Sequence, residues 1–478
     1  MRRLPLRQHL LWLGSGILGA SLLTMPISHA QDLPQVTFAP EVMLSQGLPN
    51  DNQGQVEPSV AVSVTDPSKL AAMFISGGTG RGRSTIPCPV AFSSDAGETW
   101  QVMGAGPTPT STSGCADPSV ASDVDGGFYF AYLTGGGGFP IVVGVAKSND
   151  GGRTFPVFTL AVPDVAGQSP DKPYMTVDTQ IRSRFRGNVY VAWVETDFTT
   201  STQAIRVVSS RDGARSWSSP TTISRLISFT SGEALISPVP VVGPDGRLYV
   251  FYFDGLLQTG PSNIRFSVSS DGGRRWSQPA AAAANLPTPI FFRFKNADPQ
   301  FGTKADAGTI GSGDPSVAIS SNGTIFLAWA DFPAGQCVDV GGIVDAACFN
   351  ADVRMTISKD GGKNWAVPVK VTDETNATDQ MFPWIAAHPD GLVSVMWVDK
   401  RLDPENINYD IFYTNTRDGR TFLPNVRASS QTYELGNLTF IGDYNNIAAS
   451  LEAVFPIWTA VTGVNERDIS VAKGTLSP

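Results

Sequence analysis

One short signature recurs along the chain and constrains its fold more than any other feature. It begins with Ser or Thr, has an Asp two positions later, continues with Gly-Gly or a close variant, and ends on Trp or Phe. Its copies carry the aspartates Asp95, Asp150, Asp212, Asp271, Asp360 and Asp418. Self-similarity at intervals of some tens of residues indicates a repeat architecture in which each copy belongs to one supersecondary unit.

Each residue type in this signature suits a tight turn. A carboxylate accepts hydrogen bonds from nearby backbone N–H groups, a glycine adopts positive φ, and a large ring becomes buried as the next strand begins. We therefore assign the six aspartates a structural role in hairpin turns rather than a catalytic one. We expect less regular turns in two copies, because Ala214 replaces a glycine and the copy ending at Phe422 is one residue short.

Each signature lies inside a longer unit of four short runs. The first run contains an acidic residue followed by Pro in its clearest copies, which are Glu57-Pro58, Asp117-Pro118 and Asp314-Pro315. Runs this short, rich in β-branched and aromatic residues and separated by turn residues, predict strands. Four strands per unit predict a propeller blade.

Counting the units predicts an all-β fold, a β-propeller of seven four-stranded blades, with six blades as the alternative. The last unit has three runs, the third at 468–473, and we expect no fourth strand after it. The segment 38–45 resembles the runs that follow the signature elsewhere. We therefore expect this N-terminal strand to supply the missing outer strand and close the last blade.

Residues 1–30 have the features of a secretory signal peptide. Three arginines precede an apolar stretch that is short for a membrane span, and small residues follow it. We expect this segment to be cleaved and residues 31–478 to form a single propeller domain. An uncleaved anchor is the alternative. The protein would then be secreted or periplasmic.

The four cysteines form two sequence-near pairs, Cys88 with Cys115 and Cys337 with Cys348. An even number in an exported protein predicts disulfides, and we expect each near pair to form one. Metal binding is the competing interpretation, but the spacing is not that of a ligand motif and His388 is the one histidine after residue 30. Because His388 precedes a Pro-Asp-Gly sequence, we expect it in a surface turn.

The charge of the chain limits its partners. The net charge is −9 at pH 7, and it becomes more negative without residues 1–30. An acidic protein is poorly suited to nucleic acid or anionic lipid, so we expect no nucleic-acid partner. We expect no membrane span either, because no later apolar stretch is long enough. We expect a monomer that requires no cofactor, although an acid-rich surface leaves room for a structural Ca²⁺.

On these repeats, the chain resembles the sialidase-like superfamily of Asp-box (BNR-repeat) β-propellers over essentially all of residues 31–478. That superfamily contains exo-sialidases, other glycoside hydrolases, polysaccharide lyases and propellers without catalytic activity. The resemblance implies a propeller with a carbohydrate-related role, but the fold fixes no reaction.

Propeller geometry places the starts of the first strands and the loops after the second strands on one face, opposite the signature turns. Functional sites of propellers usually occupy this channel face. Its charged residues include Glu57 and Asp171. The candidate catalytic residues are Asp117, Asp314, Asp399 and Tyr444. The candidate substrate-binding residues are Arg81, Arg83, Lys172, Glu195, Arg401 and Asp443.

These residue types favour a glycoside hydrolase-like enzyme, which needs two carboxyl groups across its substrate. A non-catalytic propeller that binds a glycan or a protein is the alternative, and any single Asp before Pro could simply cap a turn. Strict exo-sialidase activity is not expected, because the Arg-Ile-Pro-type motif is absent and such sialidases have six blades. Two insertions, 285–313 and 334–350, lie on the channel face, where we expect them to form a wall or lid.

Overall fold

The computed structural model describes residues 33–45, 48, 54–77, 87–109, 114–136, 139–256, 261–289, 291–301, 308–338, 346–464 and 466–477. The predicted signal peptide (1–30), Arg81 and Arg83 lie outside these residues. The described part consists of β-strands and one short 3-10 helix, η3 (Phe229–Ser231), so the all-β class is confirmed. None of its helices is long and apolar enough to cross a membrane.

Six sheets follow one another along the chain, and neighbouring strands pair in each. The first sheet comprises β3 (Gln55–Val62), β4 (Leu70–Ser76), β5 (Pro89–Ser93) and β6 (Gln101–Ala105). The second comprises β7 (Gly114–Ser122), β8 (Phe128–Gly136), β9 (Phe139–Ser148) and β10 (Val157–Val162). The third comprises β11 (Gln168–Val177), β12 (Val189–Asp197), β13 (Thr202–Ser210), β14 (Thr221–Thr222) and β15 (Ile227–Ser228). The fourth sheet comprises β16 (Glu233–Val242), β17 (Leu248–Leu256), β18 (Ser262–Ser269) and β19 (Ala280–Leu286). The fifth comprises β22 (Ser316–Ile319), β23 (Ile325–Asp331), β26 (Asp352–Ser358) and β27 (Val369–Lys370). The sixth comprises β28 (Gln380–Ala387), β29 (Val393–Asp399), β30 (Asp410–Thr416) and β31 (Val426–Arg427).

A seventh sheet joins the two ends of the described chain. It contains β32 (Asn446–Ala449), β33 (Ala453–Gly463), β34 (Glu466–Val471), β35 (Gly474–Ser477), β1 (Gln35–Phe38) and β2 (Val42–Met43). As predicted, β2 pairs antiparallel with β34, with Val42 opposite Val471. The expectation that no strand follows β34 is wrong, because β35 pairs with both β33 and β1 and so occupies hydrogen-bonding edges that would otherwise be open.

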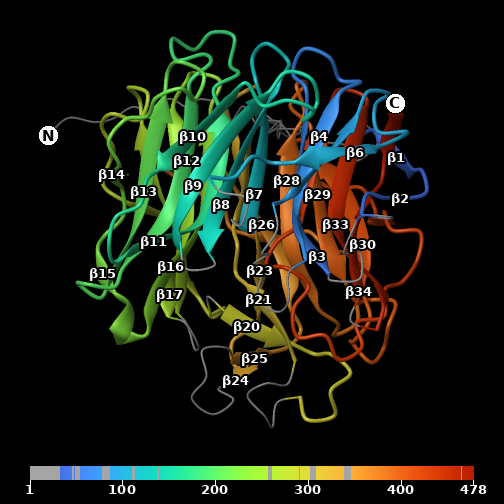
Figure 1. Ribbon diagram of the computed structural model, residues 1–478. Coiled ribbons are helices and arrows are strands. Elements are labelled where there is room, and N and C mark those ends of the chain that lie inside the picture. Colours follow the sequence, from blue (N-terminus) through green and yellow to red (C-terminus); the bar gives the residue numbers. More distant parts are fainter. Residues whose placement is uncertain are drawn as a thin grey trace, which may run out of the picture.

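The seven sheets form a closed ring. The first strand of each sheet contacts the first strand of the next, and β32 of the seventh sheet returns to β3 of the first. In Figure 1 the strands of these sheets stand side by side around the molecule. This is the arrangement of a β-propeller, with the first strands nearest the axis.

The residue-Pro pairs of the first strands are β-bulges. Glu57, Asp117, Lys172, Ser237 and Phe382 each have positive φ between 46° and 55°, and each is followed by Pro. The strand register shifts at all five positions. Proline has no N–H for the ladder, so a strand accommodates it at a bulge, which also redirects the neighbouring side chain. The predicted turn caps Glu57 and Asp117 are therefore bulges within strands, whereas Asp314 precedes β22.

Serine hydroxyls join successive sheets next to these bulges. The Oγ atoms of Ser59, Ser119 and Ser316 accept backbone N–H groups of Val120, Met175 and Ile385 at 2.9, 3.0 and 2.9 Å. In each case the donor lies in the first strand of the following sheet. In the Glu/Asp-Pro-Ser sequence, the acidic side chain thus points to the axis, and the serine accepts a hydrogen bond from the next sheet.

The signature turns lie between third and fourth strands. In the first copy, Asp95 Oδ1 accepts the N–H of Thr99 at 2.9 Å, while Ser93 Oγ accepts the N–H of Gly97 at 2.9 Å. The turn at Ala214 keeps the second contact, since its N–H donates to Ser210 at 2.9 Å with φ of 65°. The expected irregularity there is therefore not seen, because alanine itself adopts the positive φ.

The two insertions form an eighth sheet. It pairs β20 (Phe291–Phe294) with β21 (Thr309–Ser312) and, in parallel, with β25 (Ala346–Cys348), which pairs with β24 (Cys337–Val338). In Figure 1 this sheet projects below the ring. It is fixed to the chain before β32, because the N–H groups of Ala297 and Ile310 donate to the carbonyls of Gly436 and Thr439 at 2.7 and 2.9 Å.

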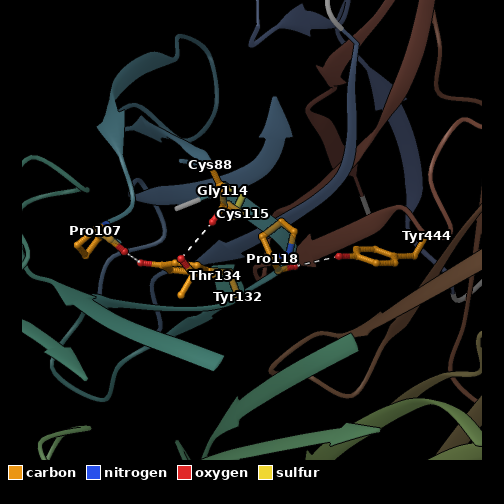
Figure 2. The surroundings of a disulfide bond; sticks show 8 residues. All are labelled: Cys88, Pro107, Gly114, Cys115, Pro118, Tyr132, Thr134 and Tyr444. Atoms are coloured by element: carbon orange, nitrogen blue, oxygen red, sulfur yellow. Dashed lines mark hydrogen bonds between the residues drawn. A yellow bond between two sulfur atoms is a disulfide. The ribbon is translucent and has the colours of Figure 1, made fainter. Parts of the chain in front are cut away.

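Both predicted disulfides are present. Cys88–Cys115 connects the first sheet to the second (Figure 2), and Cys337–Cys348 closes the β24–β25 pair. His388 is not in an exposed turn as expected but is buried. Its Nδ1 contacts the carbonyl of Ser450, and its Nε2 contacts Ser394 Oγ at 2.7 Å, so it joins the sixth and seventh sheets.

Candidate functional site

Five carboxyl groups from five sheets surround one lysine at the axis of the ring. Three of them occupy a bulge or the position next to one, and the other two precede the first strands of the fifth and seventh sheets. We call this group the central cluster. It consists of Glu57, Asp117, Asp171, Asp314, Asp443 and Lys172.

Lys172 is the cation of the central cluster, and 4% of its side chain is exposed. Its Nζ lies 2.8 Å from Asp443 Oδ2 and 3.6 Å from Asp314 Oδ2. The ammonium also lies 5.5 Å from the centre of the Tyr444 ring. Burial by itself would lower the pKa of Lys172, but the surrounding carboxylates, Asp314 foremost, raise it well above its ordinary value.

Asp314 is a buried acceptor of several hydrogen bonds. Tyr174 Oη donates to its Oδ2 at 3.3 Å, and Ser312 Oγ, at the end of β21, donates to its Oδ1 at 2.7 Å. Ser237 Oγ donates to the same oxygen. A carboxylate held by two serines, a tyrosine and a lysine has little capacity left for a ligand.

Asp117 lies between two other carboxyl groups. Its charge acts on both Glu57 and Asp171, and its Oδ2 accepts the backbone N–H of Lys172 at 3.0 Å.

The pKa values of these groups follow from that crowding. Burial, followed by the charges of Asp117 and Asp443, raises the pKa of Glu57 well above its usual value. The surrounding protein and then the charge of Asp117 raise the pKa of Asp171 to about 7. Burial also raises the pKa of Asp443, against the effect of Lys172. Glu57, Asp171 and Asp443 therefore keep their protons to higher pH than isolated carboxyl groups do.

Three aromatic rings fill the centre of the ring of sheets beside this cluster. Tyr174, Trp384 and Tyr444 come from the third, sixth and seventh sheets, and their centroids lie 5.4 to 6.1 Å apart. All three are buried. They close the axis by packing across it, so they form a core rather than an open surface on which a sugar could stack.

Tyr444 is tied to the second sheet. Its hydroxyl donates to the carbonyl of Pro118 at 3.4 Å (Figure 2). Burial is the largest cause that raises the pKa of Tyr444 well above its usual value. The hydroxyl is thus a neutral donor, and not a phenolate poised to act as nucleophile or base.

Three predicted site residues lie outside the central cluster. Glu195 accepts Trp193 Nε1 at 3.0 Å and pairs with Arg206 at 3.3 Å, within the third sheet. Asp399 accepts Trp397 Nε1 at 2.6 Å and pairs with Arg401 at 2.7 Å, at the end of β29. The structure therefore does not bring these residues to Asp117, Asp314 and Tyr444.

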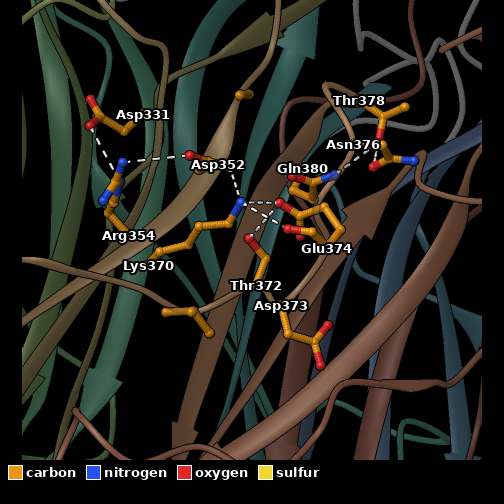
Figure 3. A network of polar contacts seen from close by, with 12 residues as sticks. Asp331, Asp352, Arg354, Lys370, Thr372, Asp373, Glu374, Asn376, Thr378 and Gln380 are labelled. Atoms are coloured by element: carbon orange, nitrogen blue, oxygen red, sulfur yellow. Dashed lines mark hydrogen bonds and ion pairs between the residues drawn. The ribbon is translucent and has the colours of Figure 1, made fainter.

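Asp399 and Arg401 belong to a chain of ion pairs between the fifth and sixth sheets, which we call the inter-sheet network. Arg401 also pairs with Glu374 at 3.2 Å and with Asp373 at 2.5 Å. Figure 3 shows the continuation, in which Lys370 contacts both Glu374 and Asp352 and Arg354 contacts both Asp352 and Asp331. This network fastens neighbouring sheets.

Sequence reasoning left several residues in or beside the central cluster out of the site. Ser237 and Ser312 were not among the candidates, and Asp171 was noted on the channel face without a role. The position of each residue before a proline could have indicated Asp171 and Ser237, because Asp171 precedes the bulge residue Lys172 and Ser237 is itself a bulge residue. Nothing in the sequence indicates that Ser312 of an insertion reaches Asp314.

No group of three or more His, Cys, Asp or Glu residues in the described part of the chain is arranged to hold a metal ion. The carboxyl groups of the central cluster instead face Lys172, Tyr174 and one another.

No protein-family model and no curated protein matches the chain. Solved structures do resemble it. A PL25 ulvan lyase bound to GlcA(1-4)Rha3S superposes with a TM-score of 0.52 and 11% identity, over 90% of this chain and 95% of that one. A GH93 α-L-arabinofuranosidase of Fusarium graminearum with arabinobiose gives 0.48 and 12%, over 91% and 97%. A Hadza microbial sialidase gives 0.45 and 14%, over 73% and 64%. At 11% identity the superposition on the ulvan lyase shows a shared fold alone, and the propeller class is confirmed.

Proposed function

We propose that this protein is an exported carbohydrate-active enzyme of the sialidase-like superfamily that hydrolyses glycosidic bonds at the central cluster. The observation that carries the proposal is the gathering of five carboxyl groups around Lys172. Glycoside hydrolysis needs one carboxyl group that donates a proton and another that stays ionised. The raised pKa values of Glu57, Asp171 and Asp443 support the first of these roles.

Within this proposal, the predicted residues take different roles. Asp117 remains the candidate catalytic carboxyl, and Asp443 with Lys172 remains the candidate contact for sugar hydroxyls. Asp314 and Tyr444 have structural roles in this proposal, because their polar atoms already have partners. Asp314 pairs with Lys172 and accepts a hydrogen bond from Ser312, and Tyr444 donates one to Pro118. Arg81 and Arg83 stay proposed substrate ligands from the loop after β4.

Hydrolysis is favoured over elimination by the state of the tyrosine. A lyase needs a base beside a uronate carboxylate, and such a base is commonly His or Tyr. Tyr444 donates its hydrogen to Pro118 and has a raised pKa, while His388 is buried between the sixth and seventh sheets. The similarity to the ulvan lyase supports a propeller that accommodates a polysaccharide.

A screen of residues 31–478 against sialosides, arabinan and uronate-rich polysaccharides tests the proposal. Asp117→Asn is expected to lower turnover by about 10²–10⁴-fold, the range for losing a positioned acid or base. Asp271→Asn, in a signature turn on the opposite face, is the matched control and is expected to keep turnover. Binding of a glycan without turnover by the wild-type protein would favour the non-catalytic propeller.

A further inference from the structure

A cavity of about 440 Å³ lies between the first and second sheets, on the face that carries the signature turns. It is lined by the turn between β3 and β4, the turn between β7 and β8, and the signature turn that contains Asp150. The central cluster lies at the starts of the first strands, which is the opposite end of the sheets. The cavity is therefore a separate place, and its volume is in the range of small-molecule sites, about 300–1,000 Å³.

Two hydrogen bonds fix the walls of this cavity to each other. The backbone N–H of Val64 donates to Ser122 Oγ at 3.0 Å, and Ser63 Oγ donates to the carbonyl of Gly126 at 3.2 Å. Both bonds join the first sheet to the second. The shape of the cavity is thus set by the protein itself, which lowers the ordering cost of binding a ligand there.

Three cations line the cavity, and two of them are available to a ligand. Lys147 is neutralised, because its Nζ lies 2.6 Å from the buried carboxylate of Asp123. Lys69 pairs with Asp66 at 3.1 Å, but 48% and 40% of their side chains are exposed, and such a pair contributes little. Arg153 is exposed, and its guanidinium donates to a backbone carbonyl at 3.1 Å rather than to a carboxylate.

The lining also contains hydrogen-bond acceptors. Asp125 and Asn149 are exposed there, and an amide both donates and accepts. Asp150 is not available, because Ser148 Oγ donates to its Oδ1 at 2.8 Å and Thr154 donates to both of its oxygens at 2.9 and 2.7 Å. Donors and acceptors in one cavity suit hydroxyl groups, which act as both.

Phe92 supplies an apolar part of the lining. Its ring is partly buried and packs edge-to-face on Phe128, with the centroids 6.3 Å apart. A Cβ atom at Gly151 would lie 2.5 Å from this ring, so the first glycine of the signature leaves room for it. The ring is therefore held in place beside the cations and the acceptors.

The corresponding ring between the third and fourth sheets is covered by the protein. There Phe185 lies next to Gly272, and the guanidinium of Arg184 lies 4.7 Å from the centre of the ring and donates to the carbonyl of Ser270 at 2.9 Å. None of the cation–π contacts in the described part of the chain involves Phe92. Beside this ring lies the cavity, which leaves the place of the guanidinium to a ligand.

We propose that this cavity is a second, non-catalytic carbohydrate site that binds an acidic sugar unit. The carboxylate or sulfate of the sugar pairs with Arg153, with Lys69 beside it. Its hydroxyl groups bond to Asp125 and Asn149, and the apolar face of its ring contacts Phe92. The site holds a polysaccharide on the face away from the central cluster, so the proposal does not depend on hydrolysis there.

Isothermal titration calorimetry with four probes tests the ligand class. The probes are trigalacturonate, neocarrabiose 4-sulfate, the neutral arabinotriose and inorganic sulfate, and the titrations use Asp117→Asn so that turnover does not consume them. At least one acidic saccharide should bind at least about tenfold more tightly than arabinotriose and inorganic sulfate, because each of these lacks one of the two recognised parts. Which acidic saccharide binds distinguishes a carboxylate from a sulfate. No binding of either, or equal binding of inorganic sulfate, would overturn the proposal.

The place of binding is tested with two matched arginines. Arg153→Ala should weaken binding of the acidic saccharide by about tenfold. Arg274→Ala changes the same position of the signature turn in the fourth sheet, where the arginine is also exposed, and should leave binding unchanged. In the wild-type protein, the bound saccharide should slow amide hydrogen exchange in residues 63–69 and 123–128. Equal losses in the two variants would show general attraction to the face and overturn the site, while the hydrolase proposal stands.

Discussion

The central cluster and the inter-sheet network contain the same residue types, yet they differ in charge balance. Each holds five acidic residues. The cluster has Lys172 as its cation, whereas the network has Arg354, Lys370 and Arg401. Burial raises the pKa of Asp331 and Glu374 in the network as well, but there a cation opposes it at ion-pair distance. Five carboxyl groups with three cations join sheets, whereas five carboxyl groups with one cation keep their protons to higher pH.

Removing the single cation of the cluster should have the largest effect. Lys172→Met leaves Asp314 and Asp443 without their partner, and breaking a buried pair in this way costs about 3–5 kcal/mol of unfolding free energy. The loss should be full at pH 8 and smaller at pH 5, where raised-pKa carboxyl groups such as Asp443 take up protons. Urea unfolding at both pH values measures it.

The control for that experiment is Lys473→Met, which breaks a pair with the exposed Glu98. It should change the unfolding free energy by less than about 1 kcal/mol. A loss for Lys172→Met that is equal at both pH values would contradict the account of an under-compensated cluster.

Removing one of several cations should cost less. Arg401→Met leaves Asp399 buried, but Trp397 Nε1 and the backbone N–H of residue 401 still donate to it. Lys370 still pairs with Glu374. We expect a loss of about 2–3 kcal/mol in urea unfolding at pH 8. If this variant lost more than Lys172→Met, the comparison between the two regions would fail.

A signature aspartate tests a third way of holding a carboxylate, by hydrogen bonds without a cation. Asp212 accepts two hydrogen bonds from Ser216 and one from Ser210, and these lower its pKa to about 2. Asp212→Ala should cost about 1 kcal/mol. Because the folded pKa is depressed, this stability is present above the unfolded pKa of about 4 and is lost as pH falls toward 2.

Thermal unfolding at pH 7, 5 and 3 distinguishes the cases. The deficit of Asp212→Ala should be constant from pH 7 to pH 5 and shrink at pH 3, whereas that of Lys172→Met should already shrink by pH 5. An Asp212→Ala deficit that grew on acidification would show that this turn is not held by its ionised carboxylate.

The smallest effect should come from the backbone of the same turn. Ala214 has φ of 65°, where a Cβ atom costs about 1–2 kcal/mol. Ala214→Gly removes that strain but increases the conformational entropy of the unfolded chain, which offsets about 0.4–1 kcal/mol. A net gain of about 0.5 kcal/mol is expected in urea unfolding. A loss of 1 kcal/mol or more would show that the buried methyl group matters more than the strain.

Local features of the sequence were enough to predict the strands, the disulfides and the pairing of β2 with β34. Each depends on a pattern within a few residues, such as alternation, a turn residue, or a run like those in the other units. The channel face was also predictable, because a meander of four strands puts the start of its first strand and the end of its second strand at the same edge. That is how Asp117, Lys172, Asp314, Asp443 and Tyr444 were found.

The tertiary structure alone separated these residues from Asp399, Arg401 and Glu195. All lie at the same ends of strands, but bulges at residue-Pro pairs turn some side chains to the axis, while Trp397 and Trp193 hold the others within their sheets. Asp443 and Lys172 are 271 positions apart, so their contact depends on closure of the ring. The sequence by itself determined the repeat and the turn chemistry, which are local. Which carboxyl groups meet, and how many cations oppose them, was decided by packing across the axis, because an electrostatic environment is the sum over neighbours that the fold brings together.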